Sequence, residues 1–173
     1  MTDGLPGRGN LSPATKSGKP TTELAEFATR LGAEGPLLGL DIGEKTVGLA
    51  ISDGTRLIAS PVETIRRTTW SKDLERLRSV VAERHVAGLV AGLPVNMDGS
   101  EGRRAQATRQ IARNILKEVD LPLLLWDERL STQAVERAML EADMSRAKRN
   151  ERVDRLAAAY ILQGALDALR RRG

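Results

Sequence analysis

The chain has 173 residues, of which 40% are hydrophobic and 29% charged, and its formal net charge is +4. Its length predicts one domain with a full-sized hydrophobic core. Because the sequence has no cysteine and only one histidine, His85, it excludes disulfide frameworks, thiolate zinc sites, iron–sulfur clusters, cysteine nucleophiles and multi-histidine metal sites. Any metal must therefore bind to oxygen ligands.

The sequence also predicts a location and a class of partner. No apolar stretch approaches the roughly 18 residues that a membrane span requires, and the N-terminus has no charged-then-apolar signal pattern. We therefore expect a cytoplasmic protein with no membrane segment. The excess positive charge lies in residues 143–173, which carry eight basic and four acidic side chains. This basic end favours a polyanionic partner, although such a helix is more often only a solvated face.

The N-terminal segment differs in amino-acid composition from the rest of the chain. Residues 1–20 are rich in glycine and proline and contain almost nothing apolar to bury. We expect residues 1–36 to form a disordered or weakly ordered leader, in which residues 22–31 are a candidate short helix without an assigned function. Residues 37–173 are expected to form a single domain.

Three β-rich runs open this domain. Residues 37–42 and 46–52 flank a tight turn at residues 43–45, and residues 57–65 complete an antiparallel meander. Helical and apolar patterns then alternate, predicting helices at 71–84 and 101–119, strands at 88–93 and 121–127, and final helices at 132–142 and 151–169.

This order predicts an α/β fold with a five-stranded mixed sheet. Three strands are antiparallel, two further strands join in parallel through right-handed crossovers, and helices cover both faces. It is the element order of a ribonuclease H-like domain.

Acidic side chains end two of the predicted strands. Asp41 and the pair Asp127-Glu128 each close an apolar run at its carboxyl end, which is where open α/β sheets bind ligands. Asp154 stands in the first turn of the last predicted helix and precedes two alanines that would let this helix approach the sheet. We expect one member of the pair to join Asp41 and Asp154, because Asp127 and Glu128 point to opposite faces of a strand.

Three carboxylates so close to one another repel unless a proton or a cation binds. Mg²⁺ or Mn²⁺ accepts oxygen-only ligands, and two such ions can support phosphodiester hydrolysis. Other interpretations of each residue remain open. Asp41 could cap the turn, Asp127 and Glu128 could pair with cations such as Arg129, and Asp154 could interact with the helix N-terminus.

Residues 92–100 are candidates for contacts with the substrate. They leave the fourth strand through a turn-rich loop and are expected to enter a helix near Ser100, whose free N–H groups suit a phosphate. Asn96 or Ser100 could hold the substrate backbone, or both could be ordinary turn and capping residues. Arg129 could contact the scissile phosphate and could equally pair with Asp127.

Four motifs occur in order along the domain. They are Asp41-x-Gly43-x-x-x-x-Gly48-x-Ala50, the loop at residues 92–100, the run Asp127-Glu128-Arg129-Leu130-Ser131-Thr132, and Asp154-x-x-Ala157-Ala158. With them the sequence resembles the YqgF (RuvX) family over residues 37–169. The resemblance implies a ribonuclease H-like fold related to Holliday-junction resolvases, with Asp41, Glu128 and Asp154 at the acidic positions expected to bind metal. It also implies processing of the 5′ end of precursor 16S ribosomal RNA.

We therefore expect a metal-dependent nuclease that acts on structured RNA, free or in a pre-ribosomal particle. Asp41, Glu128 and Asp154 would bind Mg²⁺ or Mn²⁺, and Asn96, Ser100 and Arg129 would contact the substrate. Resolution of four-way DNA junctions is the alternative. It requires two coordinated cuts and favours a dimer, whereas we expect a monomer or a weak homodimer.

The sequence argues against two further classes of protein. A non-catalytic nucleic-acid-binding module is disfavoured, because a pure binder gains nothing from carboxylates that face phosphates. An actin-like or sugar-kinase ATPase would need a second, similar domain, for which 173 residues leave no room.

Overall fold

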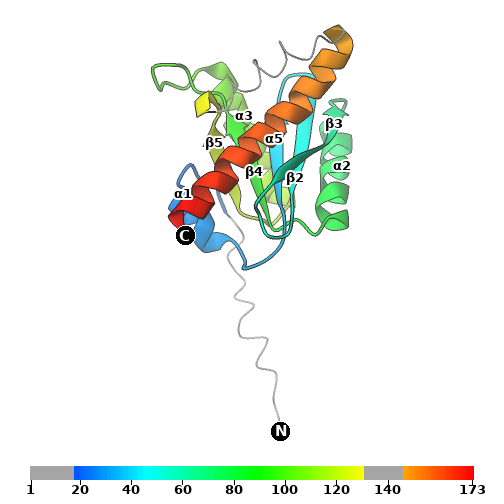
Figure 1. The fold of residues 1–173 in the computed structure, drawn as a ribbon. Coiled ribbons are helices and arrows are strands. Elements are labelled where there is room, and N and C mark those ends of the chain that lie inside the picture. Colours follow the sequence, from blue (N-terminus) through cyan, green and yellow to red (C-terminus); the bar gives the residue numbers. More distant parts are fainter. Residues whose placement is uncertain (1–17, 131–145) are drawn as a thin grey trace.

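The computed structural model of this chain describes residues 18–130 and 146–173. Its elements, in chain order, are α1 (Leu24–Arg30), β1 (Leu37–Ile42), β2 (Thr46–Ser52), β3 (Ala59–Arg66), α2 (Trp70–Glu83), β4 (Gly88–Leu93), α3 (Arg103–Glu118), β5 (Leu123–Asp127), the short 3-10 helix η2 (Glu128–Leu130) and α5 (Arg146–Arg172) (Figure 1). The helix expected at residues 132–142 lies outside the described residues.

The five strands form one sheet in the order β3-β2-β1-β4-β5. Strands β1, β2 and β3 pair antiparallel, whereas β4 pairs parallel with β1 and β5 pairs parallel with β4. A tight turn joins β1 to β2, and the Gly43 amide donates a hydrogen bond of 2.8 Å to the Thr46 carbonyl. The predicted mixed sheet, with its antiparallel meander and two parallel additions, is therefore confirmed.

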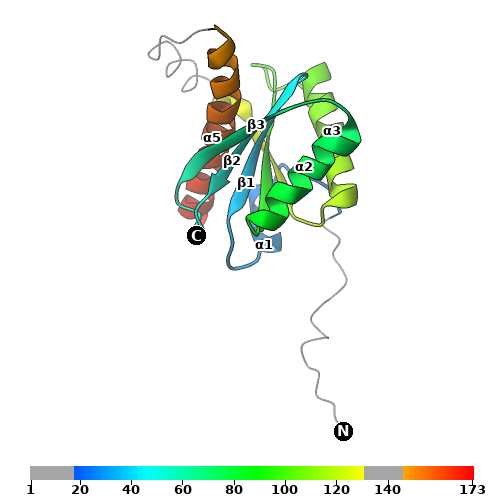
Figure 2. The same cartoon turned by 90° about the vertical axis from the view of Figure 1, so that its right-hand side faces the viewer.

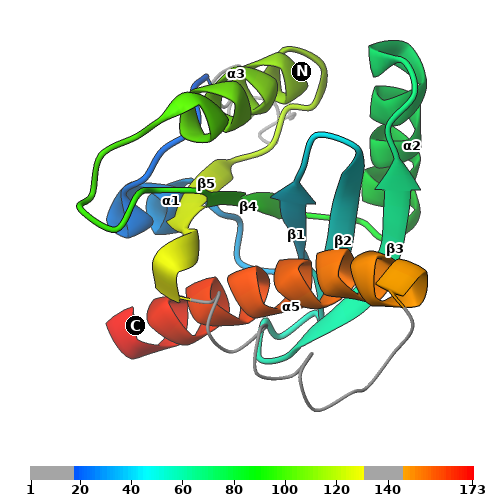
Figure 3. The same cartoon turned by 90° about the horizontal axis from the view of Figure 1, so that it is seen from above.

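Helices cover both faces of the sheet. Helices α2 and α3 lie on one face, and α5 crosses the opposite face, where α1 packs near its C-terminal end (Figures 2 and 3). The parallel strands β4 and β1 are consequently buried on both sides, and every residue of β4 is buried. This burial explains why β4 has an apolar sequence without alternation.

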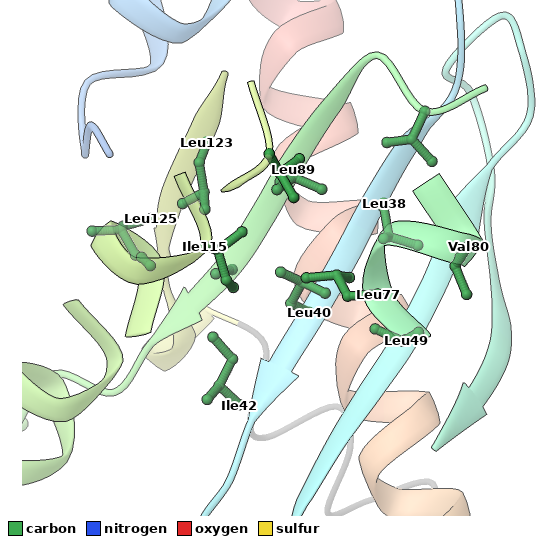
Figure 4. Packing of buried hydrophobic residues seen from close by; sticks show 14 of the residues in the cluster. Leu38, Leu40, Ile42, Leu49, Leu77, Val80, Leu89, Ile115, Leu123 and Leu125 are labelled. Carbon is green, nitrogen blue, oxygen red and sulfur yellow. The ribbon is translucent and has the colours of Figure 1, made fainter. Parts of the chain in front are cut away.

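The larger hydrophobic cluster fills the space beneath α2 and α3. Leu38 and Leu40 of β1 pack there with Leu89 of β4, and α2 and α3 contribute Leu77 and Ile115 (Figure 4). These positions follow the strand period of two and the helical spacing of three to four residues. The cluster fixes the face of β1 that is turned away from α5.

Helix α5 packs unusually close to the other face. Its buried residues recur at helical spacing: Ala158, Ile161, Leu162, Ala165 and Leu166. Glycine in the facing strand permits the approach, because a Cβ on Gly39 would lie 2.8 Å from the Ala158 carbonyl oxygen. Helix α5 therefore lies almost against the backbone of β1.

Part of the expected leader packs on the domain. Helix α1 occupies residues 24–30, within the range predicted for a helix, and its Phe27 is fully buried. Thr21 extends the edge of β5, where its amide donates to the Leu123 carbonyl at 3.0 Å and its carbonyl accepts from Leu125 at 2.8 Å. Residues 1–17 lie outside the described residues, so their expected disorder stays a prediction. Within the described ranges, no helix combines the length and apolar character needed to cross a bilayer.

Candidate active site

Asp41 is the second-last residue of β1 and lies on the face of the sheet that α5 covers. Because side chains alternate along a strand, Leu38, Leu40 and Ile42 pack beneath α2 and α3 while Asp41 points the other way. Its partner in the register of β2 is Gly48. The strand ends one residue later, so the Asp41 carboxyl lies at the carboxyl edge of the sheet, as predicted.

Glu128 reaches the same region from the end of β5. The strand ends at Asp127, and Glu128 begins η2. The carboxyl groups of Asp41 and Glu128 share a hydrogen bond. Room for Glu128 exists because residue 92 is glycine, where a Cβ would lie 2.7 Å from Glu128 Oε1. The structure thus brings Glu128, rather than Asp127, next to Asp41.

Asp154 approaches from α5. The helix begins at Arg146, so Asp154 lies about two turns inside it. The prediction that Asp154 stands in the first turn of this helix is therefore wrong. Attraction to the helix N-terminus, which fades beyond the first turn, therefore does not explain this residue. The Thr46 hydroxyl donates a hydrogen bond of 2.6 Å to Asp154 Oδ2. This bond orients the Asp154 carboxylate beside β2.

Burial, followed by repulsion from neighbouring carboxylates, raises the pKa values of both Asp41 and Glu128. The pKa of Asp41 rises from 3.8 to about 7, first because the group is buried and then because Glu128 and Asp154 lie nearby. Burial likewise raises the pKa of Glu128. Arg104 of α3 favours the charged form of both groups and so lowers both pKa values. Near neutral pH the pair retains a proton, as expected for carboxylates that are this close.

The donor chemistry of this pair fits a hard divalent cation. Its ligand atoms are all carboxylate oxygens, which Mg²⁺ and Mn²⁺ prefer, and a cation would replace the shared proton. Within residues 18–130 and 146–173, however, no three acidic or histidine side chains are already arranged around a single ion position. Asp154 is close enough to raise the pKa of Asp41, but its carboxylate is bonded to Thr46.

Asp127 faces the opposite side from Glu128 and forms an ion pair with Arg129. Arg129 Nη2 lies 2.6 Å and Nε 2.9 Å from Asp127 Oδ2, and this pairing lowers the pKa of Asp127. Arg129 Nη1 also reaches the Met97 carbonyl at 3.3 Å. Of the two roles that the sequence left open for Arg129, the structure therefore contains the ion pair. A contact with the scissile phosphate stays a prediction.

The loop after β4 is organised by its own side chains. Asn96 Nδ2 donates to Ser100 Oγ at 3.0 Å, and Ser100 Oγ donates to Asp98 Oδ1 at 2.6 Å. Helix α3 begins only at Arg103, after Gly102, so the expectation that Ser100 opens the helix is wrong. The physical reason is the local turn, in which the Ser100 hydroxyl and amide both bond to Asp98. Asn96 and Ser100 are exposed, and their substrate contacts stay predictions.

Arg104 is a member of the site that sequence reasoning missed. It stands in the first turn of α3 and acts electrostatically on both Asp41 and Glu128 from the other side of the sheet edge. The run Arg103-Arg104 gave the only sequence signal, two adjacent basic residues just beyond the loop. Because solvated helices commonly carry such pairs, the signal did not distinguish this one.

The sheet order, with acidic side chains at its carboxyl edge, defines a fold of the ribonuclease H-like class. The chain has this fold in common with "T. thermophilus RuvC in complex with Holliday junction substrate", at a TM-score of 0.51 and 17% identity, over 77% of this chain and 94% of that one. The family "RuvX: Holliday junction resolvase" matches residues 35–168. The chain belongs to the RuvX family.

Curated relatives match most of the chain. A protein of Rhodobacter capsulatus is 61% identical over 144 residues, which are 83% of this chain and 91% of the relative. One from Rhodopseudomonas palustris is 55% identical over 150 residues, 87% of this chain and 94% of the relative. Both bear the name "Putative pre-16S rRNA nuclease".

Proposed function

We propose that this chain is a divalent-metal-dependent nuclease that hydrolyses phosphodiester bonds in structured RNA, at the 5′ end of precursor 16S ribosomal RNA. The observation that carries the proposal is the hydrogen-bonded pair Asp41–Glu128 at the carboxyl edge of the sheet, with Asp154 beside it. A nuclease of this substrate would work in the bacterial cytoplasm.

Asp41 and Glu128 would hold Mg²⁺ or Mn²⁺, with Asp154 as the further acidic ligand of a two-ion site. When bound, such ions lower the pKa of a water and stabilise the charge on a leaving oxygen. The chain's own residues prepare this chemistry. Burial keeps the carboxyl pair poorly solvated, Thr46 orients Asp154, and the Asp127–Arg129 ion pair fixes the loop after β4.

Ribosomal RNA as the substrate rests on the relatives, whose printed name refers to precursor 16S ribosomal RNA. The second candidate is cleavage of four-way DNA junctions, which the family description and the shared fold with RuvC favour. That reaction needs two coordinated cuts and hence two copies of the site. A non-catalytic binding module fits poorly, because carboxyl groups that are buried together with a raised pKa are more typical of a catalytic or metal site than of a surface that binds phosphates.

A cleavage assay tests the proposal. The full chain and the variant Asp41→Asn are incubated with RNA that includes the 5′ precursor segment of 16S ribosomal RNA, and separately with a four-way DNA junction, in Mg²⁺, Mn²⁺ or chelator. Glu75→Gln, which changes an exposed carboxylate on α2, is the matched control. We expect the wild type and the control to cut the RNA with metal, and Asp41→Asn to lose the activity.

Each other outcome is decisive. Cleavage of the junction without cleavage of the RNA would favour the resolvase. Equal activity of the wild type and Asp41→Asn, or activity that persists in chelator, would contradict the proposed site.

A further inference from the structure

A basic pocket lies at the end of β1, on the side of the sheet edge opposite to α5. It encloses about 160 Å³ between the turn that follows β1 and the first turns of α3. Ile42 and Gly43 form one wall, and Arg103 and Arg104 form another. Because Ile42 and Gly43 directly follow Asp41, the pocket begins within two residues of the carboxyl pair.

Arg67 completes the pocket from the end of β3 and is fixed in place. Its Nη1 donates a hydrogen bond of 2.7 Å to the Gly43 carbonyl, and its backbone amide donates to the Lys45 carbonyl at 2.9 Å. These bonds tie the guanidinium to the β1–β2 turn. Arg67 is partly buried, so its charge lies in the wall of the pocket rather than in bulk water.

The charge of the pocket is strongly positive. Three arginines line it, and Glu44, which is exposed, is the single acidic residue of the lining. In the described part of the chain, Arg103 and Arg104 form no salt bridge with a carboxylate, whereas Arg76, Arg109 and Arg129 do. Guanidinium groups from α3 and from the end of β3 therefore line one space, with a single carboxylate beside them.

We propose that this pocket binds one phosphate of the nucleic-acid strand, a neighbour of the phosphate that is cut. The inference rests on the proposed function, because it takes the Asp41–Glu128 pair as the cutting site. Planar guanidinium forks match phosphate oxygens in bidentate geometry. The pocket also lies at the position where a strand crossing the carboxyl edge of the sheet would pass from the α5 side to the α3 side.

The positive charge of the pocket compensates for the negative charge of the acidic site. The acidic cluster carries negative charge even when the pair retains a proton, and this charge repels an approaching phosphodiester. A phosphate held by Arg67, Arg103 and Arg104 would offset that repulsion one or a few nucleotides away. Arg104 lies between the two regions, since its charge already acts on Asp41 and Glu128. The pocket thus sets the register of the strand relative to the carboxyl pair.

A thermodynamic cycle tests the proposal without relying on turnover. A single-stranded RNA that spans the cleavage site is made with one neutral methylphosphonate in place of a phosphate, scanned over the positions on either side of the cut. Binding is measured by fluorescence anisotropy in chelator at fixed ionic strength for the wild type, Arg103→Gln and Arg67→Gln. Arg113→Gln, an exposed arginine further along α3, is the matched control.

We expect Arg103→Gln and Arg67→Gln to weaken binding about tenfold and to reduce the slope of log affinity against log salt by about one. At one position, the methylphosphonate should weaken wild-type binding by a similar factor but leave the binding of these two variants nearly unchanged. Arg113→Gln should retain the wild-type response at every position. Because binding is measured, loss of catalysis cannot produce this pattern.

Two results would overturn the inference. One is wild-type affinity and salt slope in both pocket variants, and the other is a methylphosphonate effect that is the same in wild type and variants at every position. If the wild type still cuts RNA in a metal-dependent way, either result removes the phosphate pocket and leaves the proposed function intact. If the wild type neither binds nor cuts RNA, the proposed function itself fails.

Discussion

The main chain of Asp154 lies directly against Gly48. A Cβ on Gly48 would come within 2.0 Å of the Asp154 carbonyl oxygen and 2.4 Å of its carbonyl carbon. Gly48 is also the register partner of Asp41 in the neighbouring strand. One missing side chain therefore lets α5 carry Asp154 to the strand pair that bears Asp41.

Replacing Gly48 should separate these elements. In Gly48→Ala the new methyl group meets backbone atoms that cannot rotate away, so α5 must shift. We expect the free energy of unfolding to fall by about 3 kcal/mol or more. Denaturant unfolding measures this change. Gly54→Ala is the matched control, because a Cβ there would meet nothing within 4 Å, and it should stay within about 0.5 kcal/mol of the wild type. Equal stabilities of the two variants would show that α5 does not pack this closely.

The Thr46 hydroxyl is expected to affect metal binding and catalysis only by orienting the Asp154 carboxylate. Thr46→Val keeps the shape of the side chain but removes the donor of the 2.6 Å hydrogen bond. A carboxylate that loses such an orienting partner typically loses about 10 to 100-fold in metal affinity or activity. We expect a lower kcat and weaker Mn²⁺ binding in Thr46→Val, and near wild-type values in Thr46→Ser. A loss of the same size in Thr46→Ser would indicate that packing, and not the hydrogen bond, is responsible.

The carboxyl pair should make the metal-free protein less stable as the pH rises. The pKa of Asp41 is about 7 when folded and 3.8 as the ordinary value, so the folded state retains a proton that the unfolded chain releases. The stabilising contribution is therefore complete below pH 4 and is lost as the pH rises to about 7. We expect Asp41→Asn, in chelator at pH 8, to be more stable than the wild type by on the order of 2 to 4 kcal/mol.

Unfolding by denaturant across this pH range measures the effect, and added Mg²⁺ should reduce the difference. A wild-type stability that does not change between pH 4 and pH 8, or Asp41→Asn less stable than the wild type at pH 8, would show that the Asp41 carboxyl is not buried beside another acid.

Two roles of Arg129 can be distinguished by experiment: holding the loop after β4 in place, and contacting the substrate. Both partners of the Asp127–Arg129 pair are about a third exposed, so solvent screens their attraction and Arg129→Met should lower the free energy of unfolding only slightly. The loss of the bond to the Met97 carbonyl should nevertheless speed amide hydrogen exchange in the loop at residues 94–102. Arg113→Met should leave that exchange unchanged. Slower RNA cleavage with unaltered loop exchange would instead favour a direct contact between Arg129 and the substrate.

Much of the sheet could be predicted because its signals are local. Apolar runs, the tight turn at residues 43–45 and the alternation of strands with helices were sufficient for the strand order, and hence for placing Asp41 at the carboxyl edge. Because successive side chains of a strand point to opposite faces, the sequence also predicted that Asp127 and Glu128 would not both lie beside Asp41. Which of them does so depends on the glycine at residue 92, a contact from another strand that no local pattern encodes.

Other features depend on tertiary contacts. Helix α3 begins at Arg103 and not near Ser100 as predicted, because the side chains of residues 96–100 bond to one another instead of capping a helix. Helix α1 was expected in a leader without a function, yet Phe27 is buried against α5. Arg104 lies near Asp41 and Glu128 because α3 packs on the sheet, a contact between parts of the chain that are far apart in sequence.

Binding of Mn²⁺ to the purified chain, measured by calorimetry and by electron paramagnetic resonance, tests whether Asp41 and Glu128 form a metal site. We predict binding to the wild type and to Glu75→Gln, and an affinity at least about 100-fold lower in Asp41→Asn and in Glu128→Gln. Equal affinity in the wild type, Asp41→Asn and Glu128→Gln would contradict the site and, with it, the metal-dependent nuclease proposed for this chain.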